Sequence, residues 1–194
     1  MTLANRASFL TTAAKSVVFA AGLFAATMAQ AGVLSFTDTT VGGPTWNRPL
    51  TLTTLSGVGT NVAYDVTHIQ VNQTGSYSFV SAGLNPVAWD NFLVLYANAF
   101  SQTAPLANIV ALNDDLPGAG IGSAGFTLNL TAGIDYFLVE TGFNNSHAGT
   151  YSMVVTGLGG GTASIVGAAA VPEPASLALL GLGLLGVAAI RRRA

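Results

Sequence analysis

The chain has 194 residues, which is enough for one domain with additional segments. Only 7% of its residues are charged, and it contains no cysteine, so no disulfide contributes to its stability. Between Gly32 and Ala170, one positive side chain stands against seven negative ones, a net charge of −6. This balance excludes a nucleic-acid-binding surface on that part of the chain.

The first 31 residues predict a secretory signal peptide. A positive start is followed by a short apolar core from 17 to 26, and small residues then stand where a signal peptidase cuts. An N-terminal anchor or a buried helix is the alternative, but the apolar core is short for a bilayer span. The expected cleavage site is defined by Ala29, Ala31 and Gly32.

Residues 32–156 predict a single all-β domain. Apolar and polar residues alternate at 76–79, 126–130 and 151–156, which is typical of strands with one face in a core. The runs "NFLVLYA" from Asn91 and "YFLVE" from Tyr136 are apolar on both faces and predict central strands. Turn residues separate these runs, and no stretch has a helical period with caps. We therefore expect an antiparallel, jelly-roll-like β-sandwich.

Four segments of the same region carry a family resemblance: "WDNFLVLY" (89–96), "LNDD" (112–115), "LTAGIDYFLVET" (130–141) and "GTYSMVV" (149–155). Over about 95 residues, they resemble the pre-peptidase C-terminal family of β-sandwiches. The order of strand, acidic turn, hairpin and G-x-Y strand is kept, with Ile134-Asp135 where the family usually has a threonine. The resemblance implies a non-catalytic accessory or binding domain, sometimes with calcium.

Four oxygen-bearing side chains form a candidate calcium site: Asp90, Asn113, Asp114 and Asp115. Hard cations prefer clustered carboxylate and carbonyl oxygens, although the spacing is not that of an EF-hand. The alternative is a turn in which Asn and Asp side chains bond to their own backbone. A bound ion would stabilise a loop, and we expect no other cofactor.

Trp46 is the candidate ligand-binding aromatic, because "GGPTWNRP" predicts an exposed loop. Trp89 precedes a buried run and is expected in the core. His68 and His147 are the only histidines, and no G-x-S-x-G or H-E-x-x-H motif accompanies them. We therefore predict no catalytic residues and no enzymatic activity.

Residues 157–170 are small and uncharged, which predicts a flexible linker. After them comes "VPEPASLALLGLGLLGVAAIRRRA", in which residues 175–190 carry no charge. A helix over those sixteen residues would be about 24 Å long, against about 30 Å of hydrocarbon in a bilayer. We expect a short transmembrane helix with its terminal arginines on the cytoplasmic side.

This tail resembles the PEP-CTERM sorting signal of Gram-negative bacteria. The resemblance implies recognition by an exosortase, a membrane-embedded enzyme that cuts near Pro-Glu-Pro. Two prolines would keep the cut segment extended outside the bilayer. An ordinary membrane anchor is the alternative. The residues that match the signal are Val171, Pro172, Glu173, Pro174, Arg191, Arg192 and Arg193.

Together these features predict an exported protein with signal peptidase and an exosortase as processing enzymes. It would be anchored transiently in the inner membrane and then reach the cell surface or extracellular matrix. A structural or adhesive role with extracellular polysaccharide is the first hypothesis. A calcium-dependent binding module and a hydrolase of matrix polymers are the alternatives.

Overall fold

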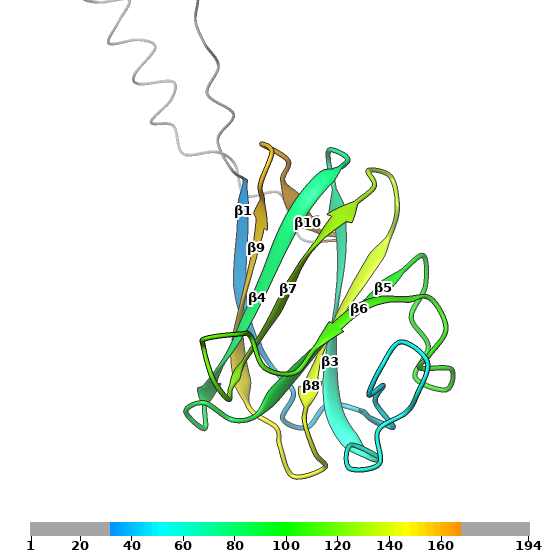
Figure 1. Cartoon of the computed structure of the whole chain (residues 1–194), viewed down its shortest axis with the longest axis vertical. Helices are drawn as coiled ribbons and strands as arrows, with labels where there is room; N and C mark the ends of the chain where they lie inside the picture. Colours follow the sequence, from blue (N-terminus) through cyan, green and yellow to red (C-terminus); the bar gives the residue numbers. More distant parts are fainter. Residues whose placement is uncertain (1–31, 168–194) are drawn as a thin grey trace, which may run out of the picture.

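The computed structural model describes residues 32–167, and these form two antiparallel β-sheets packed face to face (Figure 1). They contain strands and turns and no helix, so none of them can cross a membrane as a helix. The expected antiparallel β-sandwich is confirmed. The predicted signal peptide (1–31), sorting signal (171–194) and transmembrane helix (175–190) lie outside the described residues.

One sheet has four strands in the order β1-β9-β4-β7. Its strands are β1 (Val33–Thr39), β4 (Gly75–Asn85), β7 (Ser123–Leu130) and β9 (Thr150–Gly157). The other sheet has the order β10-β3-β8-β5-β6, with β2 paired to β3. Its strands are β2 (Thr45–Trp46), β3 (Val62–Val71), β5 (Asn91–Ala97), β6 (Ile109–Asn113), β8 (Tyr136–Gly142) and β10 (Ala163–Ile165).

The main core lies between the sheets and follows from the period-two alternation. Tyr77 and Phe79 on β4 point inward and are buried, whereas Ser76 and Ser78 are only half-buried. The expected strands at 76–79, 126–130 and 151–156 are confirmed as parts of β4, β7 and β9.

A second apolar cluster explains why β5 and β8 are buried on both faces, as predicted. Phe92, Val94 and Tyr96 of β5 point away from the main core and pack with Trp46 and Phe100. Trp46 comes from the β1–β3 connection, and Phe100 follows β5. Two loops therefore cover the outer face of the larger sheet, which an uncovered antiparallel sheet would expose to water.

The predicted linker at 157–170 is wrong for its described part, because β10 pairs with β3 from Ala163 to Ile165. Residues before β10 are also bonded to the body: the Leu158 amide donates to Ser76 O (2.9 Å), and the Asn72 amide donates to Thr162 O (3.1 Å). Small residues here allow close packing and do not give a free chain. Residues 168–170 lie outside the described part.

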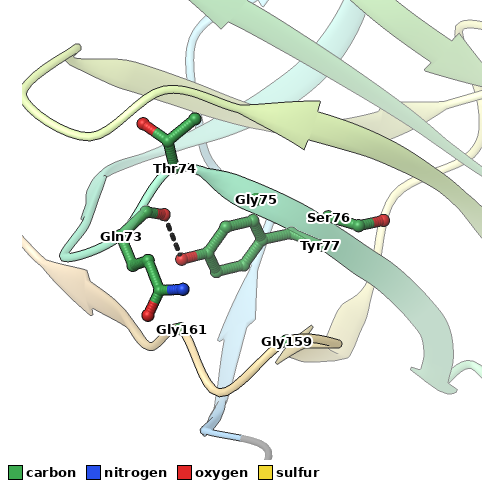
Figure 2. Close-up of a pocket in the computed structure, with 7 residues that line it drawn as sticks. All are labelled: Gln73, Thr74, Gly75, Ser76, Tyr77, Gly159 and Gly161. Carbon is green, nitrogen blue, oxygen red and sulfur yellow. Dashed lines mark hydrogen bonds between the residues drawn. The ribbon is translucent and has the colours of Figure 1, made fainter.

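Figure 2 shows this contact around the β3–β4 turn. The Tyr77 hydroxyl donates to Gln73 O (2.7 Å) beside Gly159 and Gly161. A Cβ on Gly161 would lie 2.1 Å from the Tyr77 hydroxyl oxygen, so any larger residue there would force the Tyr77 ring to move. The crevice has a volume of about 10 Å³, which is at the lower limit for one water molecule.

Candidate metal site

Strand pairing brings the predicted acidic residues together. Asp90 directly precedes β5, and Asp114 and Asp115 directly follow β6. Because β5 and β6 are antiparallel, with Leu93 opposite Asn113, the start of one strand lies beside the end of the other. These loops lie at the end of the sandwich opposite the start of β1 and the strand β10 (Figure 1).

The three carboxylates form one cluster. Asp90, Asp114 and Asp115 each offer an oxygen within 4.8 Å of the others. Asp115 is exposed, whereas Asp90 and Asp114 are half-buried. The Asp114 Oδ1 atom is buried and has no hydrogen-bond partner among the described residues. The cluster is therefore open to solvent on one side and holds an unpaired oxygen on the other.

The proximity of the three carboxyl groups makes their ionised forms unfavourable. Burial, followed by the charges of Asp90 and Asp115, raises the pKa of Asp114 to about 6. Burial also raises the pKa of Asp90, and nearby His147 opposes this effect. A divalent cation would neutralise the mutual repulsion and supply the missing partner for Asp114 Oδ1.

The donor set fits calcium in chemical type. Calcium takes six to eight oxygen ligands in flexible geometry, and three carboxylates with backbone carbonyls and water satisfy that preference. The Oδ1 of Asn113, the fourth predicted ligand, accepts the Gly125 amide (2.9 Å) and ties β6 to β7. The structure thus groups the three aspartates and uses Asn113 to join strands.

Sequence reasoning missed two residues beside the cluster. His147 Nδ1 lies 3.5 Å from Asp90 Oδ2, although the two residues are 57 positions apart in the sequence. Arg48 is fully buried, and its charge opposes the raised pKa values of Asp90 and Asp114. The only signal in the sequence was that Arg48 is the sole Lys or Arg between Gly32 and Ala170.

Arg48 also connects the loops around the site. Its Nε and Nη2 donate to Phe143 O (3.0 and 2.7 Å), and its Nη1 donates to Pro49 O (2.8 Å). The guanidinium lies 4.0 Å from the ring centroid of Phe92 and 5.1 Å from that of Phe143. These contacts combine charge-assisted hydrogen bonds with cation–π attraction and fix the β2–β3 loop to the β8–β9 loop.

Trp46 is not an exposed ligand-binding residue, because its exposed fraction is only 3%. Its Nε1 donates to Thr141 Oγ1 (3.1 Å), and its ring packs against Tyr64 and Phe100. The proline- and glycine-rich loop folds back onto the larger sheet, which buries the indole. Trp89 is in the core, as predicted, with an exposed fraction of 6%.

The histidines lie in different settings. His68 on β3 pairs with Asp135 (Nε2 to Oδ1, 2.8 Å) and stacks on Phe137, whereas His147 lies beside Asp90.

Of the predicted processing residues, Gly32 is described, and its carbonyl accepts the Gly157 amide at the start of β1. The others lie outside the described residues: Ala29, Ala31, Val171, Pro172, Glu173, Pro174, Arg191, Arg192 and Arg193.

Comparison with protein families decides the nature of the tail. Residues 170–193 match the family described as the PEP-CTERM protein-sorting motif. The chain carries a PEP-CTERM sorting motif. This motif indicates export, transient membrane anchoring at the C-terminal segment in Gram-negative bacteria, and processing by an exosortase. No curated protein matches the sequence.

Solved structures show distant likeness to the sandwich. The pre-peptidase C-terminal domain of collagenase from Bacillus anthracis is 15% identical with a TM-score of 0.41, and the match covers 64% of this chain and 89% of that one. The K3 adhesin domain of Lys-gingipain from Porphyromonas gingivalis is 14% identical with a TM-score of 0.31, covering 63% and 91%. A Paenibacillus cycloisomaltooligosaccharide glucanotransferase is 12% identical with a TM-score of 0.28, covering 64% and 18%.

Proposed function

We propose that this PEP-CTERM protein is a non-catalytic surface protein that associates with extracellular polysaccharide. The sorting motif at residues 170–193 carries the proposal, because it implies an extracellular protein processed by an exosortase. Removal of residues 1–31 by signal peptidase would precede this step. The sandwich would then reach the cell surface or matrix as a structural or adhesive component.

The outer face of the four-stranded sheet supports an adhesive role. Its strands present no charged side chain there, because the outward positions of β1, β4, β7 and β9 are hydroxyl, amide, apolar or glycine residues. Val80 and Val154 form an apolar centre between two rows that bear hydroxyl groups. The hydroxyl rows consist of Ser78, Thr127 and Thr156 on one side and Thr37, Ser123 and Ser152 on the other.

This surface suits a neutral, hydrated polymer. Hydroxyl rows beside an apolar strip offer hydrogen bonds and apolar contact without any desolvated charge. Among residues 32–167 every Trp and Tyr is buried and no Phe is exposed, so aromatic stacking on sugar rings has no support. The proposed contact therefore runs through hydrogen bonds and apolar packing across the sheet.

A hydrolase has weaker support. Retaining glycosidases place two carboxyl groups about 5–5.5 Å apart with a sugar between them. In the aspartate cluster three carboxylates, not a pair, converge so that one oxygen of each lies within 4.8 Å of the others, which is the arrangement of cation ligands. The open groove of about 420 Å³ beside β1 is lined by only one carboxylate, that of Asp38, with Thr37, Thr39, Leu84 and Thr150.

Retention on the host's extracellular polysaccharide fraction tests the adhesive proposal. We expect the wild-type protein to be retained and the Ser78→Asp/Thr156→Asp variant to bind several-fold more weakly, because binding would bury ionised carboxylates. Val110→Asp is the matched control, since Val110 is 40% exposed on the other sheet. Absence of wild-type retention, or equal loss in the control, would argue against this face.

Calcium-dependent stabilisation is a second proposed property, and the aspartate cluster supports it. The ion would be held by Asp90, Asp114 and Asp115 and would order the loops at the end opposite β10. Its role would be structural, because the ion would join the loop before β5 to the loop after β6.

A further inference from the structure

Three polar side chains from different strands meet inside the sandwich. Ser81 on β4, Asn91 on β5 and Glu140 on β8 are all at most 1% exposed. Ser81 Oγ and Asn91 Nδ2 both donate to Glu140 Oε1, each at 2.7 Å, and Asn91 Nδ2 also lies 2.9 Å from Ser81 Oγ. The group joins the two sheets, because Ser81 belongs to the four-stranded sheet and the other two belong to the larger one.

Two oxygens of this group are left over. Glu140 Oε2 and Asn91 Oδ1 are buried and have no hydrogen-bond partner among the described residues. If Glu140 were ionised, both atoms would be acceptors without a donor, and the buried charge would have no counter-ion. Such an arrangement is strongly unfavourable, because buried charges in proteins are paired or neutralised.

Among residues 32–167, no Lys or Arg side chain compensates Glu140. Arg48 is the only Lys or Arg in residues 32–167, and its guanidinium lies over Phe92, which belongs to the outer cluster of the same sheet. The other titratable groups facing this part of the core are Asp65 on β3, which is directly opposite Glu140 in register, and Tyr151 on β9. The Tyr151 hydroxyl donates to Asp65 Oδ2 (2.6 Å).

We propose that Glu140 is an uncharged carboxylic acid in the folded protein and acts as a pH-sensitive latch between the two sheets. One proton on Oε2 turns that atom into a donor for the Asn91 amide oxygen, while Asn91 Nδ2 already donates to Oε1. The resulting acid–amide pair satisfies both leftover oxygens at once. Ser81 then ties the pair to the facing sheet.

The direction of the pH dependence follows from this arrangement. Burial first, and the charge of Asp65 in addition, raise the pKa of Glu140 from 4.5 to about 8, against the lowering effect of the Ser81 and Asn91 hydrogen bonds. The contribution of the latch is complete below pH 4.5. It declines as the pH rises from 4.5 toward 8. In this range Glu140 is ionised in the unfolded chain but still protonated in the folded protein, so raising the pH favours unfolding.

Glu140→Gln in the full chain tests the latch, because glutamine keeps the shape and stays neutral. Urea unfolding is measured between about pH 7 and 8.5, above the range in which Asp114 titrates and below the range in which the tyrosines of the unfolded chain ionise. We expect the midpoint urea concentration to fall with pH in the wild type and to stay level in Glu140→Gln. The control is Glu173→Gln, which removes the other glutamate of the chain and should behave like the wild type. Equal pH dependence in Glu140→Gln and the wild type would overturn the proposal.

A second measurement decides the matter even if Glu140→Gln fails to fold. The chain has two glutamates, so carboxyl-¹³C glutamate in Glu173→Gln reports on Glu140 alone. We expect the chemical shift of a protonated carboxyl group at pH 7 and ionisation only in the alkaline range. The shift of an ionised carboxylate at pH 7, as a bound metal ion would produce, would refute the proposal.

Discussion

Replacing Asp114 by asparagine is expected to stabilise the metal-free protein and to remove most of its response to calcium. The two effects on the free energy of unfolding have opposite signs. Without a cation the Asp114 carboxylate destabilises the fold through repulsion, whereas with a cation it stabilises the fold as a ligand. Asparagine keeps the size of the side chain and an oxygen at the position of Asp114 Oδ1, but it removes the negative charge that Asp90 and Asp115 repel.

The size of the first effect follows from the pKa of Asp114. Its rise from 3.8 to about 6 means that the metal-free fold loses stability as the pH passes from about 4 to 6, and the loss persists at pH 7.5. The shift corresponds to about 3 kcal/mol at 1.36 kcal/mol for each pH unit. Because Asp114 is only partly buried, solvent screening reduces the expected gain of Asp114→Asn to roughly 1–2 kcal/mol.

Calcium should act in the other direction. At about 100 times its dissociation constant, an ion that binds only the folded state stabilises it by about 2.7 kcal/mol. For a domain of this size, each kcal/mol moves the melting temperature by roughly 3–5 °C. Asp114→Asn should lose most of this shift, because it removes one of three carboxylate ligands.

Thermal and urea unfolding at pH 7.5, with calcium or with EDTA, measure both effects. Asp38→Asn is the matched control, because Asp38 is an exposed carboxylate outside the cluster and should leave the calcium response unchanged. A wild-type protein that melts at the same temperature in calcium and EDTA would refute the metal site. Metal-free Asp114→Asn that is less stable than the wild type would refute the repulsion argument.

Two further changes test other parts of the chain. Arg48→Met should destabilise the protein by about 3–5 kcal/mol in guanidinium unfolding, because the part-buried Phe143 carbonyl and the buried Pro49 carbonyl lose their donors. Arg48→Lys should recover only part of this stability, and full stability of the Met variant would contradict the role of Arg48. In the native host, mass spectrometry should find a mature chain that starts at Gly32 and lacks Arg191, Arg192 and Arg193, whereas Pro172→Ala/Pro174→Ala should keep the arginines; a wild-type chain that retains them would contradict processing.

The local sequence pattern was sufficient to predict the strands, because the alternation of apolar and polar residues can be seen in adjacent positions. Tyr77 and Phe79 show it directly, and the runs around Leu93 and Leu138 show strands buried on both faces. Composition misled at residues 157–167, because small residues suit both a mobile chain and close packing. Gly161 and Tyr77 are in contact although they lie more than 80 residues apart in the sequence, and no local pattern reveals this contact.

The sequence by itself determined the sorting motif, since an enzyme that reads an extended segment needs only the order of residues 171–193. It also placed Asp114 and Asp115 side by side and suggested Asp90 as their partner. Only the tertiary structure decided which polar residues are paired. Strand register sets Asp90 beside His147, buries Arg48 against the rings of two phenylalanines and leaves Glu140 without a counter-ion among residues 32–167. Such electrostatic consequences depend on burial and on long-range neighbours, which arise when the two sheets close on each other.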